Sequence, residues 1–233
     1  MSLEQLREDV CRANKLLAHY GLVCLHSGNV SGLDRSTGRL VIKPSGVDYE
    51  TLSPDDLVEV DLITGKVIST HLRPSVDLPH HLYIYRNMPG VGGIAHAHSD
   101  YATAWAATGR PIPLCLTAMA DYFGGEIPCA PYVDNEGDNI GQAILRYRGR
   151  APAVLLANHG AFTWGPTALD AVKLAVALED VAKKAFLASQ LGQLLEIPVE
   201  EARKWYDKYH HGYGQIVPPR APQTVTRQPQ TSG

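Results

Sequence analysis

The stretch Gly93-Ile94-Ala95-His96-Ala97-His98-Ser99-Asp100 decides how the middle of this chain folds. Successive side chains of a β-strand point to opposite faces, so His96 and His98 share one face with Ile94, and the two alanines share the other. Residues two apart in a strand are separated by about 7 Å at Cα, because each residue rises about 3.3 Å. Both imidazoles can therefore reach one metal ion.

A third imidazole follows a second short apolar run, Leu155-Leu156-Ala157-Asn158-His159-Gly160, which predicts a strand that ends in a turn. With His96 and His98, His159 would form an open three-ligand site, in which zinc keeps one position for water or substrate. Histidines in strands are more often hydrogen-bonded core or surface residues, and His-x-His alone is only suggestive. The glycines before it and the Asn-His-Gly turn downstream favour metal binding.

Length and composition indicate one globular domain. The chain has 233 residues, of which 45% are hydrophobic and 19% charged, as in ordinary globular proteins. We expect a single domain over residues 1–215. The tail of residues 216–233, rich in Pro, Thr and Gln, should be flexible because it has too little apolar surface to offset its ordering entropy. The net charge of −3 gives no reason to expect nucleic acid or an anionic membrane as a partner.

Cysteine usage and hydropathy predict a cytoplasmic protein. The four cysteines show no C-x-x-C spacing, so we expect reduced, buried thiols rather than disulfides or a zinc knuckle. No apolar run approaches the roughly 18 residues of a membrane span, and the N-terminus lacks the basic-then-apolar pattern of a signal peptide.

The periodicities predict an α/β fold in which helices flank a central, mostly antiparallel sheet. Helices are expected over residues 3–17, 101–108, 138–147, 171–186 and 198–209, and another is expected to begin after Ser75 as its N-cap. Ser2 would be the N-cap of the first helix, and Thr167 would form a capping box before the helix over 171–186. Strands are expected over 24–26, 39–43, 57–61, 66–69, 127–132, 153–157 and 162–165, as well as around His96.

Three small polar turns are candidate anion sites: residues 27–32, residues 44–46 preceded by Lys43, and the helix start at Ser75. Their backbone N–H groups could face a phosphate or carboxylate. The plain alternative for the first turn is a hairpin connection. Asp121 lies among apolar and small residues, where its simplest role would be a helix or turn cap.

Seven ordered segments resemble the class II aldolase/adducin family, and within it most closely the L-ribulose-5-phosphate 4-epimerases. They span about residues 1–215 and read Gly28-Asn29-Val30-Ser31, Val41-Ile42-Lys43-Pro44-Ser45-Gly46-Val47, Pro74-Ser75-Val76-Asp77, His96-Ala97-His98-Ser99, Ala120-Asp121-Tyr122-Phe123-Gly124, His159-Gly160-x-Phe162-x-Trp164-Gly165 and Tyr213-Gly214-Gln215.

The resemblance implies a class II aldolase-like fold and a role for each matching residue. It implies zinc, or manganese or cobalt, bound by His96, His98 and His159, with Asp77 as a metal-site aspartate. Asp121 and Tyr213 would form an acid/base pair that acts across a subunit boundary in a cyclic homotetramer. The residues implied to bind substrate or phosphate are Gly28, Asn29, Lys43, Ser45, Gly46 and Ser75.

The activity implied is epimerisation of L-ribulose 5-phosphate to D-xylulose 5-phosphate by C–C cleavage and re-addition. A fuculose-phosphate-type aldolase, which would have Glu at position 77, and a metal-dependent decarboxylase are the alternatives; an adducin-like scaffold would lack the histidines. Two departures leave room for another phosphorylated or carboxylated substrate. Val76 replaces a serine of the phosphate site, and the segment before Tyr213 is short.

Overall fold

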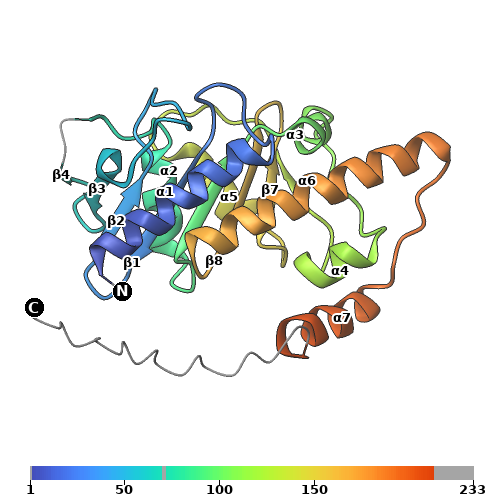
Figure 1. Ribbon diagram of the computed structural model, residues 1–233. Helices are drawn as coiled ribbons and strands as arrows, with labels where there is room; N and C mark the ends of the chain where they lie inside the picture. Colours follow the sequence, from blue (N-terminus) through green and yellow to red (C-terminus); the bar gives the residue numbers. More distant parts are fainter. Residues whose placement is uncertain (1, 70–71, 213–233) are drawn as a thin grey trace, which may run out of the picture.

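The computed structural model describes residues 2–69 and 72–212, and these form one α/β domain around an eight-stranded sheet (Figure 1). The strand order is β4-β3-β2-β1-β5-β8-β7-β6. The strands are β1 (Asn29–Asp34), β2 (Arg39–Ile42), β3 (Val58–Asp61), β4 (Val67–Ser69), β5 (Gly93–Ala97), β6 (Cys129–Ala130), β7 (Ala153–Leu156) and β8 (Gly160–Gly165).

Seven α-helices and one 3₁₀ helix are present in the described residues. They are α1 (Leu3–His19), η1 (Pro54–Asp56), α2 (Leu78–Asn87), α3 (Asp100–Ala107), α4 (Thr117–Phe123), α5 (Asn139–Tyr147), α6 (Ala168–Leu191) and α7 (Val199–Gly212). None of the helices in the described ranges is both long enough and apolar enough to cross a membrane.

The sheet is mixed. Neighbouring strands pair antiparallel from β4 through to β7, and β6 then pairs with β7 in parallel at the edge. The expected mostly antiparallel sheet is therefore corrected to a mixed one. The strands predicted over residues 57–61 and 66–69 are confirmed as β3 and β4, which pair antiparallel.

Helices cover both faces of the sheet, and the side chains of β5 alternate between them. Ala95 and Ala97 pack with residues of α1 and α6 on one face. Ile94 packs with residues of α2 and α5 on the other. This confirms the two-residue period predicted from the sequence and puts His96 on the α2 face, where its ring stacks on Phe162.

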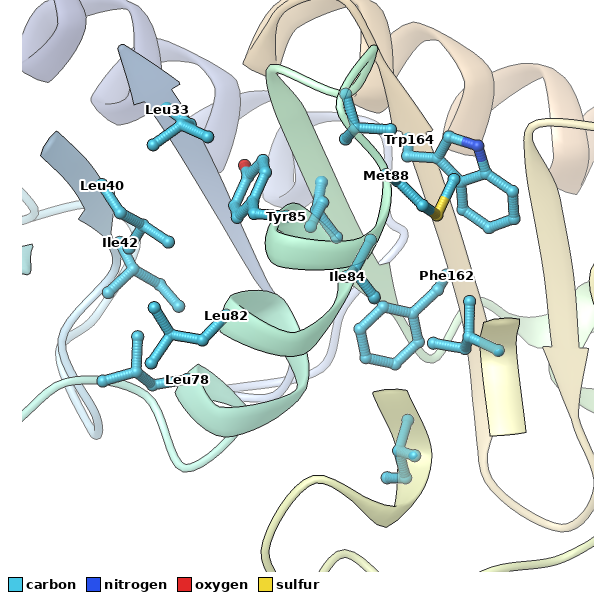
Figure 2. Packing of buried hydrophobic residues seen from close by; sticks show 14 of the residues in the cluster. Leu33, Leu40, Ile42, Leu78, Leu82, Ile84, Tyr85, Met88, Phe162 and Trp164 are labelled. Carbon is cyan, nitrogen blue, oxygen red and sulfur yellow. The ribbon is translucent and has the colours of Figure 1, made fainter. Parts of the chain in front are cut away.

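Figure 2 shows how α2 fills that face. Leu78 and Leu82 point toward Leu40 and Ile42, while Ile84 points toward Phe162 on the other side. Each is less than a tenth exposed. Full burial of such a side chain contributes about 1.5–3 kcal/mol, so α2 is firmly seated on the sheet.

Local hydrogen bonds confirm two predicted helix caps and correct a third. The side chains of Ser2 and Thr167 accept bonds from backbone N–H groups in the first turns of α1 and α6. The N-cap of α2, however, is Asp77 rather than Ser75. Ser75 instead accepts a 3.3 Å hydrogen bond from the Asp77 N–H, so it shapes the turn before the helix.

Two other expectations are corrected. Residues 24–26 form a turn rather than a strand, because the Ser27 hydroxyl group bonds both the N–H and the C=O of Cys24 and Leu25 adopts φ +53°. Asp121 lies within α4 rather than at a cap. That helix packs against α7, at one end of the molecule in Figure 1. The predicted tail, residues 216–233, and Tyr213 lie outside the described residues.

Candidate active site

Antiparallel pairing brings four chain segments to one end of the sheet. Asn29 at the start of β1 pairs with His96 near the end of β5. On the other side of β5, Ala97 pairs with Ala161 at the start of β8, next to the β7–β8 turn. The end of β2, followed by Lys43, reaches the same end because β1 and β2 are also antiparallel.

The three predicted imidazoles meet at this end. Each offers one ring nitrogen, and these nitrogens all lie within 4.8 Å of one another. The Nε2 atoms of His96 and His98 are 2.8 Å apart. The His159 ring lies 4.9 Å from that of His96 and 5.0 Å from that of His98, between centroids. Residues that are distant in sequence thus form one cluster, as predicted.

The orientation of the His96 ring is fixed by the backbone. Its Nδ1 lies 3.0 Å from the Ala161 carbonyl oxygen, which can only accept, so Nδ1 carries the proton. Nε2 is then left with a free lone pair directed at His98. A ligating histidine that donates its second N–H to a carbonyl is the usual arrangement in metal sites.

Burial keeps these imidazoles neutral. Desolvation lowers the pKa of His96 to about 3, even though the negative charge of Asp77 acts to raise it. Desolvation also lowers the pKa values of His98 and His159. Three neutral imidazole nitrogens that converge on one point fit a divalent ion of the zinc type.

The turn that carries His159 depends on special backbone geometry. Asn158 has φ +59°, a left-handed conformation that asparagine adopts more readily than most residues. A Cβ at Gly160 would stand 2.6 Å from the Ala97 carbonyl oxygen and 2.8 Å from the His98 ring. Glycine is therefore required where the β7–β8 turn passes β5.

Asp77, also predicted as a ligand, lies beside the cluster rather than in it. Its Oδ2 accepts a 2.6 Å hydrogen bond from Asn29 Nδ2, and the same amide group lies 3.1 Å from the Ser75 hydroxyl oxygen. Burial alone would raise the pKa of Asp77, but His96, His81 and the Asn29 bond outweigh it and lower that pKa. The carboxylate is thus held ionised next to the three histidines.

The predicted anion-binding residues share a cavity of about 210 Å³ with the histidines. Lys43 is 1% exposed, and burial lowers its pKa although Asp48 opposes the shift. The Lys43 and Arg73 carbonyl oxygens accept bonds from the N–H groups of Ser75 and Ser45, tying the second and third turns together. The predicted residues lining the cavity are Gly28, Asn29, Lys43, Ser45, Gly46, Ser75, Asp77, His96, His98 and His159.

Sequence reasoning missed two polar residues of the cavity, His26 and Asn135. His26 adjoins the first turn, and its contact with Asp48 at 3.1 Å has no local signature. Asn135 comes from the distant segment between β6 and α5, which no periodicity places near the histidines. Val76, flagged as a departure, lines the cavity and is 67% exposed.

Of the proposed acid/base pair, the structure describes Asp121, and this residue is not brought to the cavity of its own chain. Asp121 is absent from the lining and lies in α4. Tyr213 falls outside the described residues. Within the described residues, the arrangement therefore offers three convergent imidazole nitrogens that fit a metal ion and a cavity that also contains the buried Lys43, without Asp121.

Solved structures with the same fold include enzymes that act on sugar phosphates. One titled L-fuculose 1-phosphate aldolase is 28% identical, with a TM-score of 0.80, covering 88% of this chain and 96% of that one. YgbL from Klebsiella pneumoniae, titled a putative aldolase/epimerase/decarboxylase, is 28% identical, with a TM-score of 0.77 and coverages of 88% and 99%. L-fuculose-1-phosphate aldolase from Thermus thermophilus is 27% identical, with a TM-score of 0.65 and coverages of 80% and 96%.

The family model described as "Class II Aldolase and Adducin N-terminal domain" matches residues 8–186, which include every described residue of the cavity. The fold, the order of the seven segments along the chain and this match all indicate the same family. The chain belongs to the class II aldolase and adducin N-terminal domain family.

Proposed function

We propose that this protein is a metal-dependent enzyme that cleaves a C–C bond beside the ketone of a phosphorylated sugar. Its specific reaction is epimerisation of L-ribulose 5-phosphate to D-xylulose 5-phosphate. The observation that carries the proposal is that three convergent imidazoles and a lysine-containing set of turns share one cavity. A substrate with a metal-chelating group at one end and a phosphate group at the other would fit this cavity, with the chelating group at the imidazoles and the phosphate group at the turns.

His96, His98 and His159 would hold the metal, which we propose to be zinc, with manganese or cobalt as substitutes. When bound, such an ion supplies Lewis-acid stabilisation of the negative charge that develops on the substrate, worth several kcal/mol. The neutral state of the imidazoles supports this role, since each must present a lone pair. Asp77 would balance the positive charge from beside the cluster.

The three turns would hold the phosphate group. Lys43 provides a buried positive charge, and Ser45, Gly46 and Ser75 provide hydroxyl or backbone N–H donors in the same cavity. Retention of the phosphate is what separates an epimerase from an aldolase, because the aldehyde fragment must stay bound while it rotates.

Proton transfer requires groups on both faces of that aldehyde. A base removes the proton of the C4 hydroxyl group, the bond between C3 and C4 breaks, and the glycolaldehyde phosphate rotates. Re-addition then forms the C4 alkoxide with inverted configuration, and an acid returns a proton to it. We propose Asp121 and Tyr213 of a neighbouring subunit for these roles, within a homotetramer.

The state of Asp77 supports the epimerase over the aldolase. A base at this position would have to accept a proton, whereas the pKa of Asp77 is lowered: burial opposes the shift, but the nearby histidines and the Asn29 hydrogen bond outweigh it. A carboxylate so stabilised is a weak base. This favours acid/base groups elsewhere, as the epimerase mechanism requires.

An aldolase is the second candidate, and a specific observation favours it. Asp121 does not line the cavity of its own chain, and a solved structure 28% identical to this chain is titled L-fuculose 1-phosphate aldolase. An aldolase would release both fragments.

The test is incubation of the zinc-loaded protein with L-ribulose 5-phosphate, assaying D-xylulose 5-phosphate and free glycolaldehyde phosphate together. The epimerase proposal expects the xylulose product without free aldehyde. Parallel reactions with L-fuculose 1-phosphate and with a phosphorylated 3-oxo acid measure aldehyde and carbon dioxide release. Turnover in either of these, with none on L-ribulose 5-phosphate, would contradict the epimerase.

A further inference from the structure

Tyr49 lies behind the anion-binding end of the cavity without lining it, and its side chain is 5% exposed. Its hydroxyl oxygen is 2.8 Å from the Ser27 carbonyl oxygen and 2.8 Å from the Gly28 carbonyl oxygen. Carbonyl oxygens can only accept, so the phenol donates its single proton to this pair. Burial, with the charge of Asp77, raises the pKa of Tyr49 above its usual value, so the donor persists.

These two bonds decide which way the first turn faces. Carbonyl oxygens that faced the cavity would repel an anion, whereas here both are engaged by a phenol outside the cavity. Gly28 adopts φ +74°, and a Cβ there would stand 2.8 Å from the His96 carbonyl oxygen. The turn is therefore tightly seated between the metal cluster and Tyr49.

The ring of Tyr49 also contacts the second turn. Lys43 Nζ stands 4.6 Å from the ring centroid, within range of a cation–π interaction. Its hydrogen bond to the Pro44 carbonyl oxygen is a long one, 3.4 Å, and Lys43 forms no ion pair within residues 2–69 and 72–212. A buried ammonium group needs compensation, and the aromatic face supplies part of it.

We propose that Tyr49 is the positioning residue of the anion site: its hydroxyl group orients the Ser27–Gly28 turn and its ring seats the Lys43 ammonium group, so that both face one phosphate. This inference rests on the phosphate-binding role assigned to these turns under the proposed function. One side chain outside the cavity then links two of the three turns.

The test compares phosphate binding by the full-length, zinc-loaded protein and three variants, using inorganic phosphate and titration calorimetry. Tyr49→Phe removes the hydroxyl group and keeps the ring. Tyr49→Leu removes both. Tyr85→Phe is the matched control, because it also deletes a buried phenol, 2.8 Å from the Ser31 hydroxyl oxygen in β1, and Tyr85 does not line the cavity. Zinc content and melting temperature are measured for each.

The expected result is a phosphate Kd raised about tenfold in Tyr49→Phe, the scale of one hydrogen bond, and raised several-fold further in Tyr49→Leu. Zinc content should stay unchanged, and Tyr85→Phe should bind phosphate like the unaltered protein. In two-dimensional NMR, phosphate should shift the Gly28 and Gly46 amide signals of the unaltered protein, and the Gly28 response should be lost in Tyr49→Phe.

Three results would overturn the inference. Unaltered phosphate affinity in whichever Tyr49 variant purifies folded would remove Tyr49 from the site. An equal loss of phosphate affinity in Tyr85→Phe would show that the Tyr49 variants act through general destabilisation of the fold. If the unaltered protein itself binds no phosphate, the phosphate-binding part of the proposed function fails first, and the inference fails with it.

Discussion

The two ends of the cavity are built in different ways. At the metal end, the proposed ligands are side chains whose positions follow from strand pairing, with His96 in β5 and His159 in the β7–β8 turn. At the anion end, the donors belong to turns, and side chains such as Tyr49 and Ser75 hold them. Strand pairing fixes the positions of the histidines at the metal end, whereas a change of a single side chain can alter the turns of the anion end. We therefore expect the metal end to define the chemistry and the anion end to tune the substrate.

The largest effect should come from breaking the metal end. His98→Ala removes one of three nitrogens that lie within 4.8 Å of one another and should abolish both zinc binding and turnover. Zinc per chain is measured by mass spectrometry after dialysis. His19→Ala, at an exposed histidine in α1, should keep full zinc and serves as the control. A zinc-free, fully active His98→Ala protein would reject the site.

The next effect tests whether a third region, α4, completes the cavity from a neighbouring chain. Asp121→Asn should leave zinc content unchanged and lower turnover by about 10²-fold, the scale of general acid–base catalysis. Asp180→Asn, at an exposed aspartate of α6 paired with Lys184, should have no such effect. Light scattering should give a tetramer. Normal turnover in Asp121→Asn, or an active monomer, would rule out the shared site.

The fold was largely predictable because its strongest signals are local and periodic. The alternation around His96 predicts β5 and its two faces, and the Ser2 and Thr167 caps follow from short-range hydrogen bonds. The errors lie where polar side chains override local pattern. Ser27 bonds both backbone groups of Cys24 and forms a turn where a strand was expected, and Ser75 bonds forward to Asp77 instead of capping α2.

The stability cost of replacing two glycines of the anion end tests how tightly the first turn is packed. Gly28 and Gly46 have nearly equal positive φ, +74° and +72°, but a Cβ at Gly28 meets Val23 at 2.6 Å, and one at Gly46 meets nothing within 4 Å. Gly46→Ala should cost about 1–2 kcal/mol of unfolding free energy for the left-handed backbone. Gly28→Ala should cost about 1–3 kcal/mol more through overpacking. Urea unfolding measures both, and equal costs would contradict the tight seating of the first turn.

The smallest effect should come from restoring a donor at the cavity mouth. Val76→Ser adds a hydroxyl group at an exposed lining position and should tighten phosphate binding by up to about tenfold, as one hydrogen bond allows. Val67→Ser, on edge strand β4, is the matched control. Titration calorimetry measures both. Unchanged or weaker binding in Val76→Ser would show that this position does not face the phosphate.

The candidate site was only partly predictable, for reasons of distance along the chain. His-x-His is a local signal, whereas its meeting with His159 depends on the pairing of β5 with β8. The placement of Asp77 beside the cluster depends on Asn29, 48 residues away, and Asn135 reaches the cavity from a segment with no periodic signal. The order of the segments pointed to His159 and Asp77 better than spacing did, and neither pointed to Asn135.

The most direct test of the central claim is X-ray absorption at the zinc edge of the zinc-loaded, full-length protein. Three histidines with an open position predict about three nitrogen neighbours at roughly 2.0–2.1 Å, plus oxygen from water, and no sulfur. The nitrogen shell should be lost in His98→Ala. Zinc–sulfur distances near roughly 2.3 Å, or a shell of oxygen alone, would place the metal elsewhere and contradict the account.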